Sequence, residues 1–260
     1  MKKILLVGLV VGWFGGWVVG GSIASAEIFK ISNLPAGTEQ YRVSDKASGQ
    51  PRWQSAQKVQ QLTDQGKTFL YLDENGSGLY GSDKKDKTWN AKSYFYLAGG
   101  RLVPYQVNIV YKDKSGAAAG RISKYYDRQN KQVVCTTNGA VKTFDFKDDI
   151  VDKEDLGFCL MNYPFEEKRD MVFYLLTHEP TLYRVTFKYK GVETLTRNGK
   201  PVDCYKLEMI PDLGALNIFG AFVPKTYFWY TTGPDHDFVR YEGLESGLGT
   251  PYIVMEGQRQ

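Results

Sequence analysis

Apolar and polar side chains alternate with a period of two along most of this chain, and this pattern limits the fold more than any other feature. One segment shows it clearly, with apolar residues at Tyr183, Val185, Phe187 and Tyr189. Successive side chains of a β-strand point to opposite faces of a sheet, so this segment has one apolar and one polar face. Strands of this kind build antiparallel sheets that bury one face only.

The same alternation recurs in segments that are separated by turn residues. Apolar faces are expected from Tyr105, Val107, Ile109 and Tyr111, from Tyr205, Leu207 and Met209, and from Tyr227 and Trp229. Asn198-Gly199 and Asn138-Gly139 predict hairpin turns, because this dipeptide adopts the positive φ angles of a type I′ turn. Asn75-Gly76 and Gln65-Gly66 carry a similar signal.

Further strands are expected at residues 39–44, 53–62, 68–73, 93–97, 120–127, 132–137, 140–146, 225–231, 238–242 and 251–256. Residues 53–62 also have apolar side chains at helical spacing, which leaves a helix open there. The chain contains 18 Tyr and 14 Phe, residues that favour strands, and it shows no linker and no repeat. A single, mainly β domain over residues 27–260 is therefore predicted.

One helix is predicted, at residues 149–163. Acidic residues stand at its start, where they suit a helix N-terminus, and Pro164 ends it. Its apolar side chains are Ile150, Leu156, Cys159, Leu160 and Met161. The acidic residues Asp152 and Asp155 are interpreted as part of this helix start.

The first 26 residues have the layout of a secretory signal peptide. Lys2 and Lys3 form a positive start, residues 4–21 are apolar, and Ala24-Ser25-Ala26 supplies the small residues that a signal peptidase reads. Cleavage after Ala26 and export to the periplasm are therefore predicted. An uncleaved anchor is the alternative, since the run approaches the roughly 20 residues that a membrane span needs. No later segment is as apolar, so no membrane span is expected in the mature chain.

Charge and cysteine content exclude some classes of protein. The net charge of +4, from 33 basic and 29 acidic residues, is too small to argue for nucleic acid or an anionic membrane surface. Cys135, Cys159 and Cys204 form no Cys-x-x-Cys pair, which excludes a thioredoxin-like or zinc-ribbon site. One disulfide among them and three buried free thiols both remain open.

The sequence contains no motif for catalysis, metal binding or cofactor binding. Residues 245–249 lack the leading glycine of a serine-hydrolase motif, and no phosphate-binding loop or dinucleotide fingerprint is found. Asp235-His236-Asp237 follows turn residues and is interpreted as an exposed hairpin tip, and His178 as a surface loop residue. We therefore predict no catalytic residue, no metal ligand and no cofactor.

The C-terminal half carries a pattern that resembles a known group of proteins. Its parts are Gly191-Val192-Glu193-Thr194, a strand that contains Cys204, a strand that contains Trp229, and a preceding helix that starts at Asp149. Residues 141–256 resemble an exported bacterial β-protein family of unknown function. The resemblance implies an antiparallel, strongly curved sheet or half-open barrel with one short helix near its concave side, similar to the half-barrels of periplasmic lipoprotein carriers. It implies no catalytic residues.

These expectations lead to a hypothesis of ligand binding. If the alternating strands are neighbours, their apolar faces form one aromatic wall that is wider than the predicted helix. A groove for an apolar or lipid-like ligand of the cell envelope is predicted on this wall, lined by Tyr183, Val185, Phe187, Tyr189, Tyr205, Leu207, Met209, Tyr227 and Trp229. The alternatives are a structural or interaction protein whose own side chains fill the groove, and a hydrolase that uses paired carboxylates.

Overall fold

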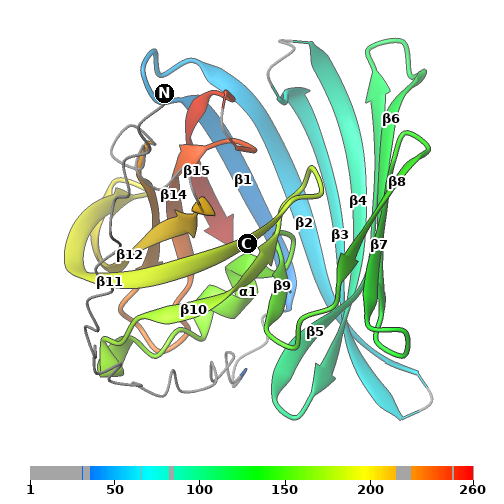
Figure 1. Ribbon diagram of the computed structural model, residues 1–260. Helices are drawn as coiled ribbons and strands as arrows, with labels where there is room; N and C mark the ends of the chain where they lie inside the picture. Colours follow the sequence, from blue (N-terminus) through cyan, green and yellow to red (C-terminus); the bar gives the residue numbers. More distant parts are fainter. Residues whose placement is uncertain are drawn as a thin grey trace, which may run out of the picture.

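The computed structural model describes residues 31, 36–64, 66–81, 85–214, 224–247 and 249–259. The predicted signal peptide and its cleavage after Ala26 lie outside these residues. The described chain folds into one sheet of 15 strands that curves around a short helix (Figure 1). The predicted mainly β fold, a curved half-barrel with a helix on its concave side, is confirmed.

The strands of the N-terminal half are β1 (Gly37–Asp45), β2 (Pro51–Asp64), β3 (Lys67–Leu79), β4 (Asp86–Ala98), β5 (Arg101–Asp113), β6 (Ala118–Asp127), β7 (Gln132–Thr137) and β8 (Ala140–Asp145). The C-terminal half contains β9 (Ile150–Asp152), β10 (Met171–Leu176), β11 (Leu182–Arg197), β12 (Lys200–Asp212), β13 (Thr226–Thr231), β14 (Phe238–Leu244) and β15 (Tyr252–Arg259). The helix α1 (Leu156–Met161) and the 3₁₀ turn η1 (Phe165–Glu167) connect β9 to β10.

The strand order is β8-β7-β6-β5-β4-β3-β2-β1-β15-β14-β13-β12-β11-β10-β9. Strands that pair in this sheet also follow one another along the chain, except that β1 pairs with β15, where Glu39 lies opposite Arg259. Among the described strands the pairs are antiparallel apart from β9 with β10. The connection between these two parallel strands places α1 inside the curve of the sheet.

The predicted turns are confirmed at two of the Asn-Gly positions. Asn138-Gly139 and Asn198-Gly199 have positive φ angles at both residues and join β7 to β8 and β11 to β12. Asn75-Gly76 is not a turn, because both residues lie inside β3. Residues 53–62, for which a helix was the alternative, belong to strand β2.

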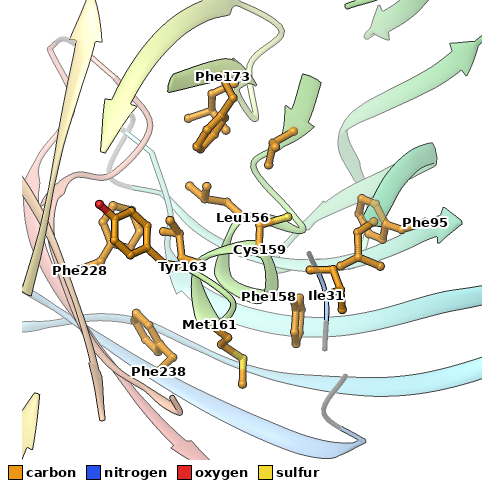
Figure 2. Packing of buried hydrophobic residues seen from close by; sticks show 14 of the residues in the cluster. Ile31, Phe95, Leu156, Phe158, Cys159, Met161, Tyr163, Phe173, Phe228 and Phe238 are labelled. Carbon is orange, nitrogen blue, oxygen red and sulfur yellow. The ribbon is translucent and has the colours of Figure 1, made fainter. Parts of the chain in front are cut away.

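The helix is shorter than the prediction of residues 149–163. Ile150 and Val151 are β-branched and form strand β9 beside β10, so α1 begins only at Leu156. The sheet curves around α1, so side chains on every side of this helix are buried (Figure 2). The buried residues of α1 are Leu156, Phe158, Cys159, Leu160 and Met161.

The concave face of the sheet forms the main hydrophobic core together with α1. Val107 and Ile109 are fully buried in it, as the alternation predicted. Tyr105 lies on the other face, against Tyr96 and Tyr125, which corrects the prediction that it shares a face with Val107. The pairing of β4 with β5 shifts register between Tyr94 and Phe95, and this irregularity reverses the alternation.

The two ends of the sheet, β8 and β9, meet through side chains instead of a backbone ladder. A separate cluster of buried residues from β6, β7, β9 and β10 lies at this seam: Tyr126, Val133, Cys135, Ile150 and Leu176. Phe144 of β8 is partly buried and packs against this cluster. Lys142 of β8 also donates from its Nζ to the Pro180 carbonyl at 3.2 Å. The barrel is therefore not closed by backbone hydrogen bonds between β8 and β9, but side chains pack across the seam.

The three cysteines are buried and free, so the open question of a disulfide is answered in favour of thiols. Cys135, Cys159 and Cys204 lie in three different clusters of the core. Among the described residues, no helix has the length and apolar character needed to cross a membrane.

Candidate functional site

A cavity of about 180 Å³ lies between the concave face of the sheet and α1. We call it the main cavity. Its walls come from β1 to β5, from the segment before α1, and from β13 to β15. The aromatic residues that line it are Tyr41, Trp53, Tyr80, Trp89, Tyr111, Phe158, Phe228, Tyr230, Phe238 and Tyr241. The ionisable residues, besides these tyrosines, are Glu39, Glu74, Lys153, Glu154, His178 and Glu245.

Three rings of the N-terminal half form a continuous aromatic wall. Trp53 and Trp89 meet edge to face with ring centroids 5.5 Å apart, and Tyr80 packs on Trp89 at 5.3 Å. Trp89 lies directly over Gly76 of β3, where an added Cβ would come within 2.0 Å of the indole ring. Gly76 is therefore required for the close approach of the ring, not for a turn.

Residues 152–155 bring four ionisable side chains into the barrel just before α1, and we call them the charged segment. Asp152 accepts from Lys124 Nζ at 2.9 Å and 3.1 Å, and the Tyr126 hydroxyl also donates to it. Both Lys124 and Asp152 are fully buried. Asp155 is the N-cap residue of α1, as its interpretation as an acid of the helix start expects, although its side chain is fully buried. The same interpretation of Asp152 is wrong, because Asp152 belongs to β9.

The next two residues of the charged segment face the main cavity. Lys153 donates from Nζ to the Glu245 carbonyl at 3.0 Å. Burial lowers the pKa of Lys153 although Glu154 and Glu245 act in the opposite direction. Glu154 Oε1 lies 3.0 Å from His178 Nδ1. The hydrogen bond from His178 overcomes the effect of burial and lowers the pKa of Glu154 to about 2.

His178 links this carboxylate to the aromatic wall. Burial lowers the pKa of His178, so the ring is neutral at pH 7. A neutral ring donates from Nδ1 to Glu154 and accepts at Nε2 the hydroxyl of Tyr111. His178 is 7% exposed, which corrects its interpretation as a surface loop residue.

Glu245 closes the opposite side of the cavity and is fully satisfied. Its carboxylate accepts from Arg52 Nη2 at 3.1 Å, from Trp53 Nε1 at 2.7 Å and from the Gly81 amide at 2.7 Å. Arg52 Nε adds a bond of 3.2 Å. These bonds connect the β14–β15 loop to β2, so Glu245 fixes the position of Trp53.

Glu74 of β3 differs from the other carboxylates of the cavity. Trp89 Nε1 donates to its Oε1 at 3.3 Å, and among the described residues no lysine or arginine forms an ion pair with it. Burial raises the pKa of Glu74 to about 7, and the charge of Glu154 acts in the same direction, whereas Ser55, Trp89 and the charge of Lys153 act against it. Glu74 is thus partly protonated at neutral pH and lines the cavity.

A second cavity of about 130 Å³ adjoins the first. Both are lined by Lys153, Leu156, Phe228, Tyr241 and Glu245, so these residues form the wall between them. Three residues of the predicted groove line the second cavity, namely Tyr183, Val185 and Met209. The predicted groove therefore corresponds in part to the smaller of the two cavities.

Four other predicted residues lie on the same concave face but are covered by protein. Phe187 and Leu207 are fully buried in the core. Tyr205 stacks on Phe165 of η1 with ring centroids 4.3 Å apart, and Tyr189 packs beside Tyr205. The turn η1, which the sequence did not predict, covers this part of the wall.

Tyr227 and Trp229 lie on the opposite, convex face. The prediction that they line one groove together with the residues of β11 and β12 is therefore wrong. Trp229 lies opposite Lys206 in the β12–β13 pair, and Phe228 lies opposite Leu207. Trp229 Nε1 donates to Glu193 Oε2 at 3.2 Å, and Lys206 Nζ lies 5.0 Å from the Trp229 ring. Strand β13 is aromatic on both faces, so alternation alone could not tell which face is inside.

The remaining sequence candidates have structural roles. Asp235 is exposed, but His236 donates from Nδ1 to the Met161 carbonyl at 3.0 Å and packs on Phe165, so the tip is only partly solvated. Within the described ranges, no group of three or more His, Cys, Asp or Glu is placed to hold a metal ion.

Sequence reasoning missed the polar residues of the main cavity. Glu74 belongs to β3, Lys153 and Glu154 to the segment between β9 and α1, and His178 and Glu245 to the loops after β10 and β14. Long-range pairing of the strands brings these residues together. One signal was available: Asp152-Lys153-Glu154-Asp155 stands immediately before an apolar helix. Four charges at that position must either end the helix in solvent or find partners inside the protein.

Comparisons with known proteins give structural neighbours of low sequence identity. No protein-family model matches the chain, and no curated protein matches it. A beta-barrel-like protein of the domain of unknown function DUF1849 from Brucella abortus is similar with 7% identity and a TM-score of 0.49, over 87% of this chain and 97% of that one.

Two further solved structures are similar over most of their length. The hypothetical lipoprotein YmcC from Escherichia coli has 12% identity and a TM-score of 0.29, over 88% of this chain and 89% of that one. An exported-type protein with a YmcC-like fold from Bacteroides fragilis has 12% identity and a TM-score of 0.33, over 89% and 98%.

Proposed function

We propose that this protein is a non-catalytic binding module of the periplasm that holds a small apolar or lipid-like ligand in the main cavity. The observation that carries the proposal is the cavity itself, because protein interiors are close-packed and rarely leave a void of this size. Its volume of about 180 Å³ is suited to one ring or a short acyl segment. An apolar cavity of roughly 150 Å³ in another protein binds benzene.

The ionisable groups of the cavity support binding more than catalysis. His178 is held between Glu154 and Tyr111, so both ring nitrogens already have partners. Burial raises the pKa of Tyr111 far above its usual value, so its hydroxyl stays protonated. This chain of hydrogen bonds fixes the position of Tyr111 in the cavity wall and offers no activated nucleophile.

The second candidate function is a structural protein with a self-filled core. The burial of α1 on every side favours it, since the helix already occupies the centre of the barrel (Figure 2). The two functions differ in whether the main cavity takes up a molecule from outside.

The deciding experiment uses Gly157 of α1, which lines the main cavity. A Cβ added at this position would meet no atom within 4 Å, so a larger side chain can grow into the cavity. Purified full-length protein and the variants Gly157→Leu and Gly157→Ala are extracted with organic solvent and analysed by mass spectrometry. Binding of added 1-octanol is measured in parallel by tryptophan fluorescence.

Wild type and Gly157→Ala are expected to bind 1-octanol, whereas Gly157→Leu should lose at least tenfold in affinity because its side chain fills the space. A folded wild type that yields no apolar compound on extraction and binds no octanol would support the structural function instead.

A further inference from the structure

The carboxylates of the main cavity differ in the hydrogen-bond donors and cations that stabilise their negative charge. Glu154 has its bond from His178, and Glu245 has Arg52, Trp53 and the Gly81 amide. Glu74 has the long bond from Trp89 Nε1 at 3.3 Å. Ser55 and the charge of Lys153 also favour the ionised form of Glu74. Among the described residues, however, no lysine or arginine forms an ion pair with this carboxylate.

Carboxylates outnumber cations among these lining groups. Glu74, Glu154 and Glu245 face Lys153 inside the cavity and Arg52 behind Glu245. His178 is neutral at pH 7 because burial lowers its pKa. Lys153 Nζ is already bonded to the Glu245 carbonyl, so an anionic ligand would meet an excess of carboxylates.

The wall next to Glu74 suits a cation. Trp89 donates to Glu74, and the rings of Trp53 and Tyr80 lie within 5.5 Å and 5.3 Å of Trp89, measured between centroids. Faces of tryptophan and tyrosine attract ammonium groups, more strongly where water is excluded. A protonated amine at this place can form a charge-assisted hydrogen bond with the carboxylate and a cation–π contact with the rings.

We infer that the main cavity binds an amphiphile whose polar end is a protonated amine, with the ammonium group at Glu74 and the apolar part along the aromatic wall toward Leu156 and Phe228. This inference rests on the proposed function and names the class of ligand for the same cavity. Ligand binding then ionises Glu74, and the ion pair forms inside the barrel.

The binding of such a ligand depends on pH through Glu74. The charged and titratable groups that face it are Glu154, Lys153 and His178, Glu39 and Tyr41 from β1, Tyr80 and Tyr111 from the aromatic wall, and Glu245. An alkylamine stays protonated up to about pH 10, like a lysine side chain. Between pH 5 and pH 8 the main change is therefore on Glu74, whose pKa is about 7.

The test compares three probes with the same chain length: n-octylamine, 1-octanol and octanoate. Their affinities for the full chain are measured by calorimetry at pH 8 and pH 5, with wild type, Glu74→Gln and Glu193→Gln. Glu193 serves as the control because its carboxylate lies on the convex face beside Lys206 and Trp229.

At pH 8 the wild type should bind octylamine at least tenfold more tightly than octanol, and octanoate least. Glu74→Gln should abolish this preference and keep octanol affinity within about twofold, whereas Glu193→Gln should change neither. At pH 5 the preference in wild type should fall to a few-fold at most. The wild-type comparison across pH needs no variant, so it holds even if Glu74→Gln folds poorly.

The outcomes separate the two proposals. Octanol binding that equals or exceeds octylamine binding in wild type at pH 8 overturns the amine inference and leaves the proposed binding function intact. A preference for octylamine that persists in Glu74→Gln overturns it as well. Failure of all three probes to bind contradicts both proposals.

Discussion

The two sides of the charged segment differ in how completely their buried carboxylates are paired. On the packed side, Asp152 is fully buried and its carboxylate is bonded to Lys124 and Tyr126. On the cavity side, Glu154 faces Glu74, which feels the charge of Lys153 but forms no ion pair with a lysine or arginine among the described residues. A buried charge that is fully paired stabilises one arrangement of the chain, whereas an incompletely paired one is expensive to keep unless a ligand or water completes it. The first side therefore holds the fold and the second is available for binding.

The largest expected effect comes from breaking the packed side. Lys124→Met leaves the Asp152 carboxylate buried without its cation, and removal of one partner of a buried pair typically costs about 3–5 kcal/mol. The free energy of unfolding in urea measures this loss. Lys92→Met is the control, since Lys92 is exposed on β4 and its loss should stay within about 0.5 kcal/mol. A cost below about 1 kcal/mol for Lys124→Met would show that the pair does not hold the charged segment.

The next effect is the pH dependence of the cavity side. The pKa of Glu74 rises from 4.5 to about 7 on folding, so the folded state binds the proton more tightly than the unfolded state. Stability from this group is therefore full below about pH 4.5 and is lost as the pH rises to about 7. The size of the loss is on the order of 2 kcal/mol, since each pKa unit corresponds to about 1.4 kcal/mol and cavity water reduces the effect.

Glu74→Gln should remove this dependence and make the protein more stable than wild type at pH 8. The difference in unfolding free energy between variant and wild type, measured from pH 4.5 to pH 8, isolates Glu74 from other carboxylates. A constant difference over this range would contradict the assignment of a raised pKa to Glu74.

A smaller effect is expected at the cavity face of α1. Gly157→Ala should raise the free energy of unfolding by up to about 1 kcal/mol, because alanine favours a helix and its methyl group meets open space. Thermal unfolding followed by circular dichroism measures the gain. Destabilisation by this variant would mean that the cavity is closed at Gly157.

The smallest effect is predicted for Asp155 on the packed side. Burial raises the pKa of Asp155 well above its usual value, and the charge of Asp152 adds to this, so both effects favour the neutral form of the side chain. Asp155→Asn replaces the carboxyl group by a neutral amide of the same shape and should change stability by less than about 1 kcal/mol. The free energy of unfolding in urea is measured for Asp155→Asn and for Asp152→Asn. Equally large losses in the two variants would contradict the preference of Asp155 for the neutral form.

The alternation of side chains predicted the strands well because it is a local property. The odd-numbered residues of 183–189 and 205–209 form the core side of β11 and β12 as expected. The two hairpin turns at Asn138 and Asn198 follow from backbone preference. The face of β13 could not be predicted, because Tyr227 and Trp229 on one side and Phe228 and Tyr230 on the other are equally aromatic. The inward face is decided by pairing with β12, which is a property of the whole sheet.

The candidate site was harder to predict from the sequence, because its partners also come together only in the folded sheet. Charged residues before an apolar stripe resemble a solvated helix start, and nothing near Asp152 in the sequence indicates a buried partner. Lys124 is contributed by β6, His178 by the loop after β10, and Glu245 by the loop after β14. Only the three-dimensional arrangement shows that these distant groups neutralise the segment and that, among the described residues, Glu74 forms no ion pair with a lysine or arginine.

The pairing of β1 with β15 has a consequence for how the chain folds. In the observed strand order, this contact alone joins strands that are far apart in the sequence of the described residues, and it lies in the middle of the sheet. A circular permutant that links Arg259 to Gly37 and opens the chain between β8 and β9 would make every pair of neighbouring strands consecutive. Folding rates rise as contacts become more local. Such a permutant should therefore reach the same barrel by sequential addition of hairpins, and stopped-flow refolding should show it to be faster than the natural connectivity.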